Sequence, residues 1–158
     1  MEWAASKGHI DVVRALTQRG LDVNASGPTG FTALHEAARE NHVEILRLLL
    51  EAGADKNAAI YRSGCTPLHW AAMQGHVAAT EALLNADADA ELLCGPHNLT
   101  AMGWAASEGH IDVVRALIQR RVDVNATGPT GFTALHEAAR GNHVEVLRLL
   151  LEAGADKD

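Results

Sequence analysis

The apolar residues of this chain occur in short groups with the spacing of a helix. Ile10, Val13 and Leu16 fall three residues apart, which places their side chains on one helical face. Gly20 follows directly, and glycine commonly ends helices because it adopts a left-handed backbone without strain. The pattern predicts a short amphipathic helix over residues 10–19.

A seven-residue segment recurs ahead of such helices. TALHEAA begins at Thr32 and returns unchanged at Thr133, whereas Thr66 begins TPLHWAA and Thr100 begins TAMGWAA. The leading threonines are 34, 34 and 33 residues apart, and a threonine hydroxyl can cap a helix by accepting a bond from its free backbone N–H groups. A fixed period of this length is typical of repeat proteins, each unit here being a helix, a turn and a second helix.

The period divides the chain into repeats of one domain. We predict an all-α solenoid of about five stacked units, with the whole of residues 1–158 as a single domain. The repeats run over residues 2–26 (partial), 27–59, 60–94, 95–127 and 128–158. Asp87, Gly103 and Arg121 depart from the pattern, so the junction of the third and fourth repeats is expected to be the weakest seam.

A longer period overlies the first. Residues 3–56 align with residues 104–157, and seven of these 54 positions differ. Fold maintenance alone does not require such identity at surface positions. A recent duplication of three repeats, or deliberate construction, accounts for it.

Several motifs together resemble the ankyrin-repeat family. They are TPLH at Thr66, the Gly-His pairs beginning at Gly8, Gly75 and Gly109, and LLEAGAD beginning at Leu49 and Leu150. The resemblance covers the whole chain and implies β-hairpin loops followed by two antiparallel helices, stacked into a curved array. It also implies a non-enzymatic module that binds another protein along a concave face, without a cofactor.

The same resemblance implies which residues contact a partner. These are hairpin-tip and first-helix positions: Pro28, Thr29, Phe31, Arg39, Glu40, Tyr61, Arg62, Ser63, Cys65, Met73, Gln74, Pro96, His97, Leu99, Ser107, Glu108, Pro129, Thr130, Phe132 and Arg140. Phe31 and Phe132 have two interpretations of equal weight. Each is an exposed aromatic contact beside an arginine, or each packs its hairpin onto the next repeat.

Charge and hydropathy narrow the choice of partner. Thirteen basic and twenty acidic residues leave a net charge of −7, which argues against nucleic acid or an anionic membrane, since both bind basic surfaces. No apolar run approaches the roughly 18 residues of a membrane span, and the N-terminal residues lack the features of a signal peptide. We expect an intracellular, cytoplasmic location.

Two cysteines are too few for a disulfide framework and lack metal-ligand spacing. Cys65 and Cys94 are interpreted as free thiols in a reducing compartment. A bridge is the alternative, because both fall in the hairpin regions of adjacent repeats.

No catalytic residue and no metal ligand is predicted. Eight of the nine histidines occur at two repeated positions, in the heptad or in the turn between helices, where the resemblance implies structural hydrogen bonds; His97 is out of register. Asp87, Asp89 and Glu91 lack the twelve-residue loop of a calcium site, so a solvated helix exit is favoured. Motifs for metalloproteases, serine hydrolases and phosphate-binding loops are absent from the sequence.

A second functional class stays open. Near-identical cassettes and a partial first repeat also fit an engineered or excised scaffold without a dedicated partner. Repeat arrays need polar terminal units, and we find none here, so head-to-tail stacking of molecules is expected.

Overall fold

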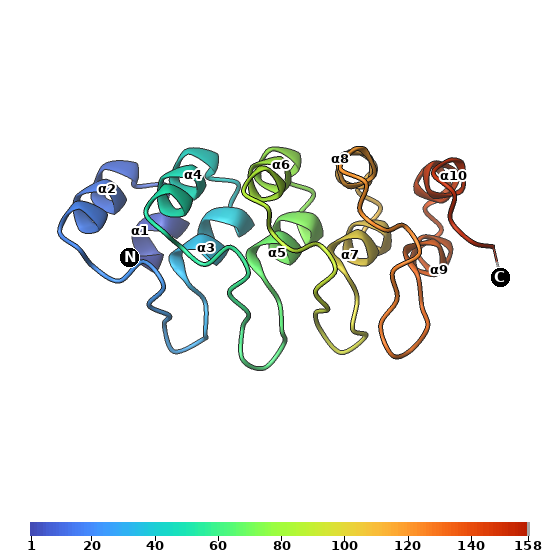
Figure 1. Cartoon of the computed structure of the whole chain (residues 1–158), viewed down its shortest axis with the longest axis horizontal. Coiled ribbons are helices and arrows are strands. Elements are labelled where there is room, and N and C mark those ends of the chain that lie inside the picture. Colours follow the sequence, from blue (N-terminus) through green and yellow to red (C-terminus); the bar gives the residue numbers. More distant parts are fainter. Residues whose placement is uncertain (158) are drawn as a thin grey trace.

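The computed structural model describes residues 1–157, and within them the chain forms five pairs of antiparallel helices. Figure 1 shows two rows, with the odd-numbered first helices beneath the even-numbered second helices and the loops extending from the first row. The expected all-α solenoid is confirmed. The bounds are α1 Glu2–Ser6, α2 Ile10–Gln18, α3 Ala33–Arg39, α4 Val43–Glu51, α5 Pro67–Met73, α6 Val77–Asn85, α7 Ala101–Ser107, α8 Ile111–Gln119, α9 Ala134–Arg140 and α10 Val144–Glu152.

Threonine caps and left-handed residues mark helix ends as the sequence indicated, and the helix predicted over residues 10–19 is α2, which ends at Gln18. The Thr32 hydroxyl accepts the backbone N–H of His35 at 3.4 Å, and Thr100 caps α7 in the same way. Gly20 and Gly53 end second helices with positive φ angles. Asp87 and Arg121 take the same left-handed conformation, with φ of 57° and 58°, so the backbone geometry persists where glycine is replaced.

One continuous apolar core runs through all five repeats, from Ala5 to Ala155. Alanine pairs such as Ala71 and Ala72 are fully buried in the first helices, and their small side chains allow neighbouring helices to approach closely. The second helices supply larger buried residues, among them Leu46 and Leu83. Because each pair is covered by its neighbours, the core exists only in the stacked array.

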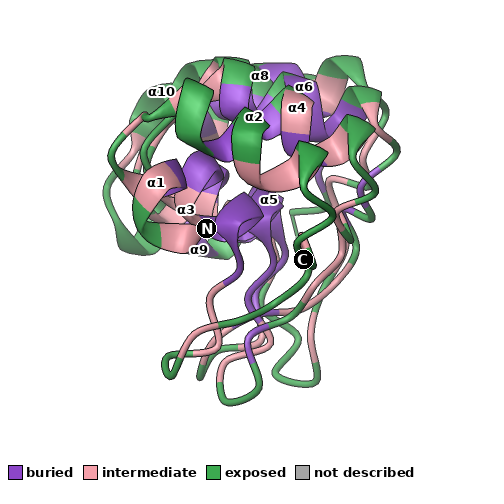
Figure 2. Ribbon diagram, turned by 90° about the vertical axis from the view of Figure 1, so that its left-hand side faces the viewer, coloured by how far each residue is buried: buried purple, intermediate pink, exposed green. Residues whose placement is uncertain are grey.

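The loops before the first helices are hairpins with little β-structure. Single antiparallel bridges join Ser26 to Thr32 and Cys94 to Leu99, and residues 1–157 contain no longer strand. Figure 2 shows the loops hanging below the helices, buried where they meet the helices and exposed at their tips. The predicted β-hairpins are therefore tight turns with one bridge at most.

Histidines join successive repeats in both directions. The backbone N–H of Thr32 donates to Nδ1 of His35, so Nε2 carries the proton and donates to the carbonyl of Cys65 in the next repeat at 3.1 Å. His69 bonds the Leu92 carbonyl likewise at 2.9 Å. The structural role expected of the heptad histidines is confirmed for these two.

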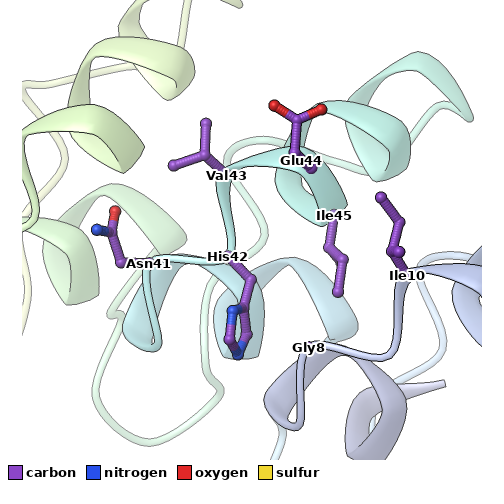
Figure 3. Close-up of a pocket in the computed structure, with 7 residues that line it drawn as sticks. All are labelled: Gly8, Ile10, Asn41, His42, Val43, Glu44 and Ile45. Carbon is purple, nitrogen blue, oxygen red and sulfur yellow. The ribbon is translucent and has the colours of Figure 1, made fainter.

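The turn histidines bond the preceding repeat. Nε2 of His42 lies 3.2 Å from the Ser6 carbonyl, and Figure 3 shows its ring beside Gly8 in the groove between the first two turns. A side chain at Gly8 would meet the His42 ring at 3.0 Å and would have to adopt a φ of +74°. The residues that line this groove therefore pack the first repeat against the second. His76, His110 and His143 make equivalent bonds.

A chain of aspartate and asparagine side chains crosses every junction beside the second helices. Oδ1 of Asp22 accepts the N–H of Asn24, whose own Oδ1 accepts the N–H of Asp55 at 2.7 Å. Asp55 repeats the pattern with Asn57, which accepts from the Asp89 N–H. The remaining links are made by Asp89, Glu91, Asp123, Asn125 and Asp156.

The irregular repeats change specific bonds. Gly103 replaces the heptad histidine, so the hydrogen bond that such a histidine donates to the next hairpin is lost between the fourth and fifth repeats. Glu91 replaces an asparagine in the polar chain and accepts the Asp123 N–H at 3.3 Å. The relative weakness of the third junction stays a prediction.

None of the helices in residues 1–157 is both long enough and apolar enough to cross a lipid bilayer.

We predict that stability falls as the pH drops from 6.5 towards 4. Burial lowers the pKa of His69 to about 4 and also lowers that of His35. At His69 the unfolded chain therefore takes up a proton in this window while the folded chain does not, which costs up to about 1.4 kcal/mol per pH unit. The lowered pKa of His35 acts in the same direction. Urea unfolding at pH 7, 6 and 5 measures the slope. His69→Gln should show a shallower slope, and parallel slopes for the two proteins would refute this account.

We also predict that Glu91→Asn raises the free energy of unfolding by about 1 kcal/mol at pH 7. Asn24 and Asn125 each donate to a carbonyl at the end of the next second helix, which a carboxylate cannot do. Desolvation, followed by the neighbouring Asp123 and Asp89, raises the pKa of Glu91. The folded state thus disfavours its charged form, and the gain should shrink as the pH falls towards 4. Asn125→Glu, which removes such a donor, is the reverse control; no gain in the first variant and no loss in the second would contradict the prediction.

Candidate functional site

The hairpin loops and the exposed sides of the first helices form one surface, called here the inner face. Most residues predicted to contact a partner are exposed on it. The exposed ones are Pro28, Thr29, Glu40, Tyr61, Arg62, Gln74, Pro96, His97, Glu108, Pro129, Thr130, Phe132 and Arg140. Phe31, Arg39, Ser63, Met73 and Ser107 are half-buried.

Two residues of the predicted set do not reach the surface. Cys65 and Leu99 are 5% and 2% exposed, because both hairpins turn these positions towards the helices. Neither can touch a partner directly, and we leave both out of the contact surface.

An aromatic cluster occupies the middle of the inner face. The Phe31 ring lies 5.1 Å from that of Trp70 in the next repeat and 5.6 Å from that of His35. The Arg39 guanidinium carbon lies 5.5 Å from the centre of the Phe31 ring, close enough for a cation–π interaction. Phe31 thus packs its hairpin onto the next repeat while its arginine neighbour stays half-exposed.

The two phenylalanines differ in their surroundings. Phe132 is 51% exposed and contacts the ring of its own His136 at 5.5 Å, whereas Phe31 has Trp70 beside it. The packing interpretation therefore describes Phe31, whereas Phe132 is exposed and its contact with a partner stays a prediction.

Trp70 and Trp104 are inner-face residues that the predicted set omits. Both are half-buried beside Met73 and pack on Ile60 and the two cysteines. The sequence carried a signal for them, since tryptophan alternates with glutamate at one first-helix position. Such an alternation indicates packing between repeats but not exposure, and the structure leaves both side chains half-exposed.

The cysteines are joined, which corrects the interpretation as free thiols. Cys65 and Cys94 form a disulfide between the third and fourth hairpins, with Cα atoms 4.6 Å apart. The tight hairpins bring the two positions together although 29 residues separate them. The intracellular location consequently stays a prediction that this bond does not support, because disulfides persist mainly in oxidising compartments.

Ion pairs hold the inner-face arginines in place. Arg39 lies 2.7 Å from Glu36 and 3.0 Å from Glu40. Arg140 pairs with Glu137 at 2.5 Å, and that carboxylate is 2% exposed. Each of these arginines therefore lies beside the carboxylate three residues before it.

The second helix of each pair (α2, α4, α6, α8 and α10) belongs to a different surface, and these are called here the outer helices. Exposed pairs three residues apart lie along them, such as Glu44 with Arg47 and Glu145 with Arg148. Such pairs are well solvated and contribute little to binding or stability. Aromatic and sulfur-containing side chains gather on the inner face instead.

The buried histidines of this region serve the fold. Within residues 1–157, no group of three histidine, cysteine or acidic side chains could hold a metal ion. His35 and His69 are buried and neutral, with both ring nitrogens used in bonds to the fold. The inner face is suited to contact with another molecule.

Comparison with known families gives one result. A family model described as ankyrin repeats (3 copies) matches residues 1–60, 58–128 and 89–158. No curated protein matches the chain.

We predict that reducing the Cys65–Cys94 bond lowers the free energy of unfolding by about 2–4 kcal/mol, since the bond closes a loop in the unfolded chain. The loss should concentrate at the third junction, which the bond spans. Hydrogen exchange with and without a phosphine reductant measures it, and Cys94→Ala should be insensitive to the reductant. Equal protection of α5 and α7 under both conditions would contradict the prediction.

Proposed function

Because the chain belongs to the ankyrin-repeat family, we propose that it binds a partner protein through its inner face. Ankyrin repeats are generally protein–protein interaction modules, and the family is typically non-enzymatic. The contact would involve the hairpin tips and the exposed sides of the first helices. No cofactor enters this proposal.

The contrast between the two sides of the array carries the proposal. Trp70, Met73 and Trp104 remain half-exposed on the inner face, although a solvated surface does not require them there. Binding hot spots are enriched in aromatic side chains and arginine, and Arg39 lies over the same cluster. Charged pairs on the outer helices offer no comparable surface.

A second candidate is a scaffold that assembles with itself. The near-identity of residues 3–56 and 104–157 favours it, and the expectation of head-to-tail stacking belongs here. Trp3 is 82% exposed at one end of the described array, and Val144 is exposed at the other. Sedimentation that shows dimers and larger species growing with concentration would support this candidate; a monomer at all concentrations would reject it.

We predict that a new charge on the inner face weakens partner binding at least about tenfold, since burying an unpaired charge at an interface costs more than about 1.4 kcal/mol. Gln74→Arg places the charge at the exposed end of α5. Glu81→Arg places the same side chain on α6 of the same repeat. A partner captured by the unmodified chain should lose affinity for the first variant and keep it for the second.

The same two variants can also refute the proposal. Equal affinity of the partner for both variants would show contacts away from the inner face. Loss with Glu81→Arg alone would place the contact on the outer helices. Circular dichroism of both variants checks that the helices are retained.

A further inference from the structure

A cleft of about 520 Å³ lies between the second and third hairpins. It is lined by Gly27, Pro28, Thr29, Gly30, Ile60, Tyr61 and Arg62. The hairpin of residues 60–65, like that of residues 94–99, is one residue longer than the loops before α3 and α9. The cleft is internal to the array and lies on the inner face.

Tyr61 is the most exposed large side chain of this region, at 97% of its full surface. Its backbone is nevertheless fixed, because the Ile60 carbonyl accepts the N–H groups of Ser63 and Gly64 at 3.1 and 2.8 Å. The Ile60 N–H closes the loop by donating to Cys65 at 3.0 Å. A rigid backbone that presents an exposed tyrosine gives contact area at a small entropic cost.

Arg62 differs from the inner-face arginines described above. Arg39 and Arg140 lie within 3.0 Å of carboxylates, whereas in residues 1–157 no acidic side chain lies within ion-pair distance of Arg62. The lining of the cleft contains no carboxylate either. Arg62 is thus the one charged residue that lines the cleft, and the nearby Glu2 carboxylate lies against Gly27.

We infer that the cleft binds an acidic, extended segment of the partner protein. An apolar side chain of that segment packs on the Tyr61 ring and the Pro28 ring, and a neighbouring carboxylate pairs with the Arg62 guanidinium. A planar guanidinium recognises a carboxylate through two parallel hydrogen bonds. This inference rests on the proposed function of the inner face and names the class of segment that it takes.

The chain contains its own control. The tetrapeptide Gly-Pro-Thr-Gly of residues 27–30 recurs at residues 128–131, and Pro28 and Pro129 are both exposed. Tyr61 is the one tyrosine in the sequence, so only the first tetrapeptide has the tyrosine and arginine beside it. Pro28→Ala and Pro129→Ala thus make the same change with and without the proposed cleft.

The test uses random twelve-residue peptides displayed on phage and selected against the full chain and against Arg62→Glu in parallel. The inference predicts that the unmodified chain enriches peptides with a carboxylate next to an apolar residue, and that Arg62→Glu removes this preference. Synthetic copies of the enriched peptides should bind at least about tenfold more weakly to Tyr61→Ala and Arg62→Glu, as expected for a hot spot. Pro28→Ala should weaken binding, and Pro129→Ala should not.

Two outcomes would overturn the inference. Enriched peptides with no preference for acidic residues would do so, as would affinities unchanged by Arg62→Glu. If those peptides lose affinity for Gln74→Arg instead, the proposed function of the inner face survives and the cleft is not its contact. If they lose affinity only for Glu81→Arg, both proposals fail.

Discussion

Mutual burial of neighbouring repeats is the constraint on which this structure depends. A pair of helices seven and nine residues long cannot cover its own apolar side, so each pair is completed by the next. Alanines in the first helices and leucines in the second set how closely the pairs approach. The apolar contact alone would let repeats slide and rotate, because it has little directionality.

Directional bonds fix the stacking. Buried histidines bond forward, turn histidines bond backward, and the aspartate–asparagine chain follows the exits of the second helices. These bonds use backbone groups that would otherwise be buried without a partner. The side chains of the hairpin tips take no part in these bonds. The disulfide adds a covalent link where the third and fourth hairpins meet and supports the aromatic cluster beside it.

The fold could be predicted from the sequence because local signals repeat in register. Threonine caps and left-handed helix ends recur in register from the second repeat to the fifth, so the helix pairs and the solenoid could be predicted. The disulfide was only the alternative interpretation of the two cysteines, because residues 29 positions apart carry no local sign of being in contact. Only the close approach of two hairpins brings them together.

The sequence predicts which positions belong to the hairpin tips and first helices. It predicts less well which of their side chains are exposed. Tyr61 and Arg62 lie at a hairpin tip as expected, while Cys65, four residues after Tyr61, is buried by the turn. Trp70 packs against Ile60 and the cysteines and is also half-exposed, which the sequence does not indicate. Burial within a hairpin depends on how the next repeat covers it, and that information is not local to the sequence.

The claim that the inner face is the binding surface is tested most directly by hydrogen exchange on the complex with a captured partner. Partner binding should slow amide exchange in the hairpins of residues 27–31 and 60–64 and at the exposed end of α5. Amide exchange in α4, α6 and α8 should stay as in the free protein. Protection confined to the outer helices, with the hairpin amides exchanging as in the free protein, would contradict it.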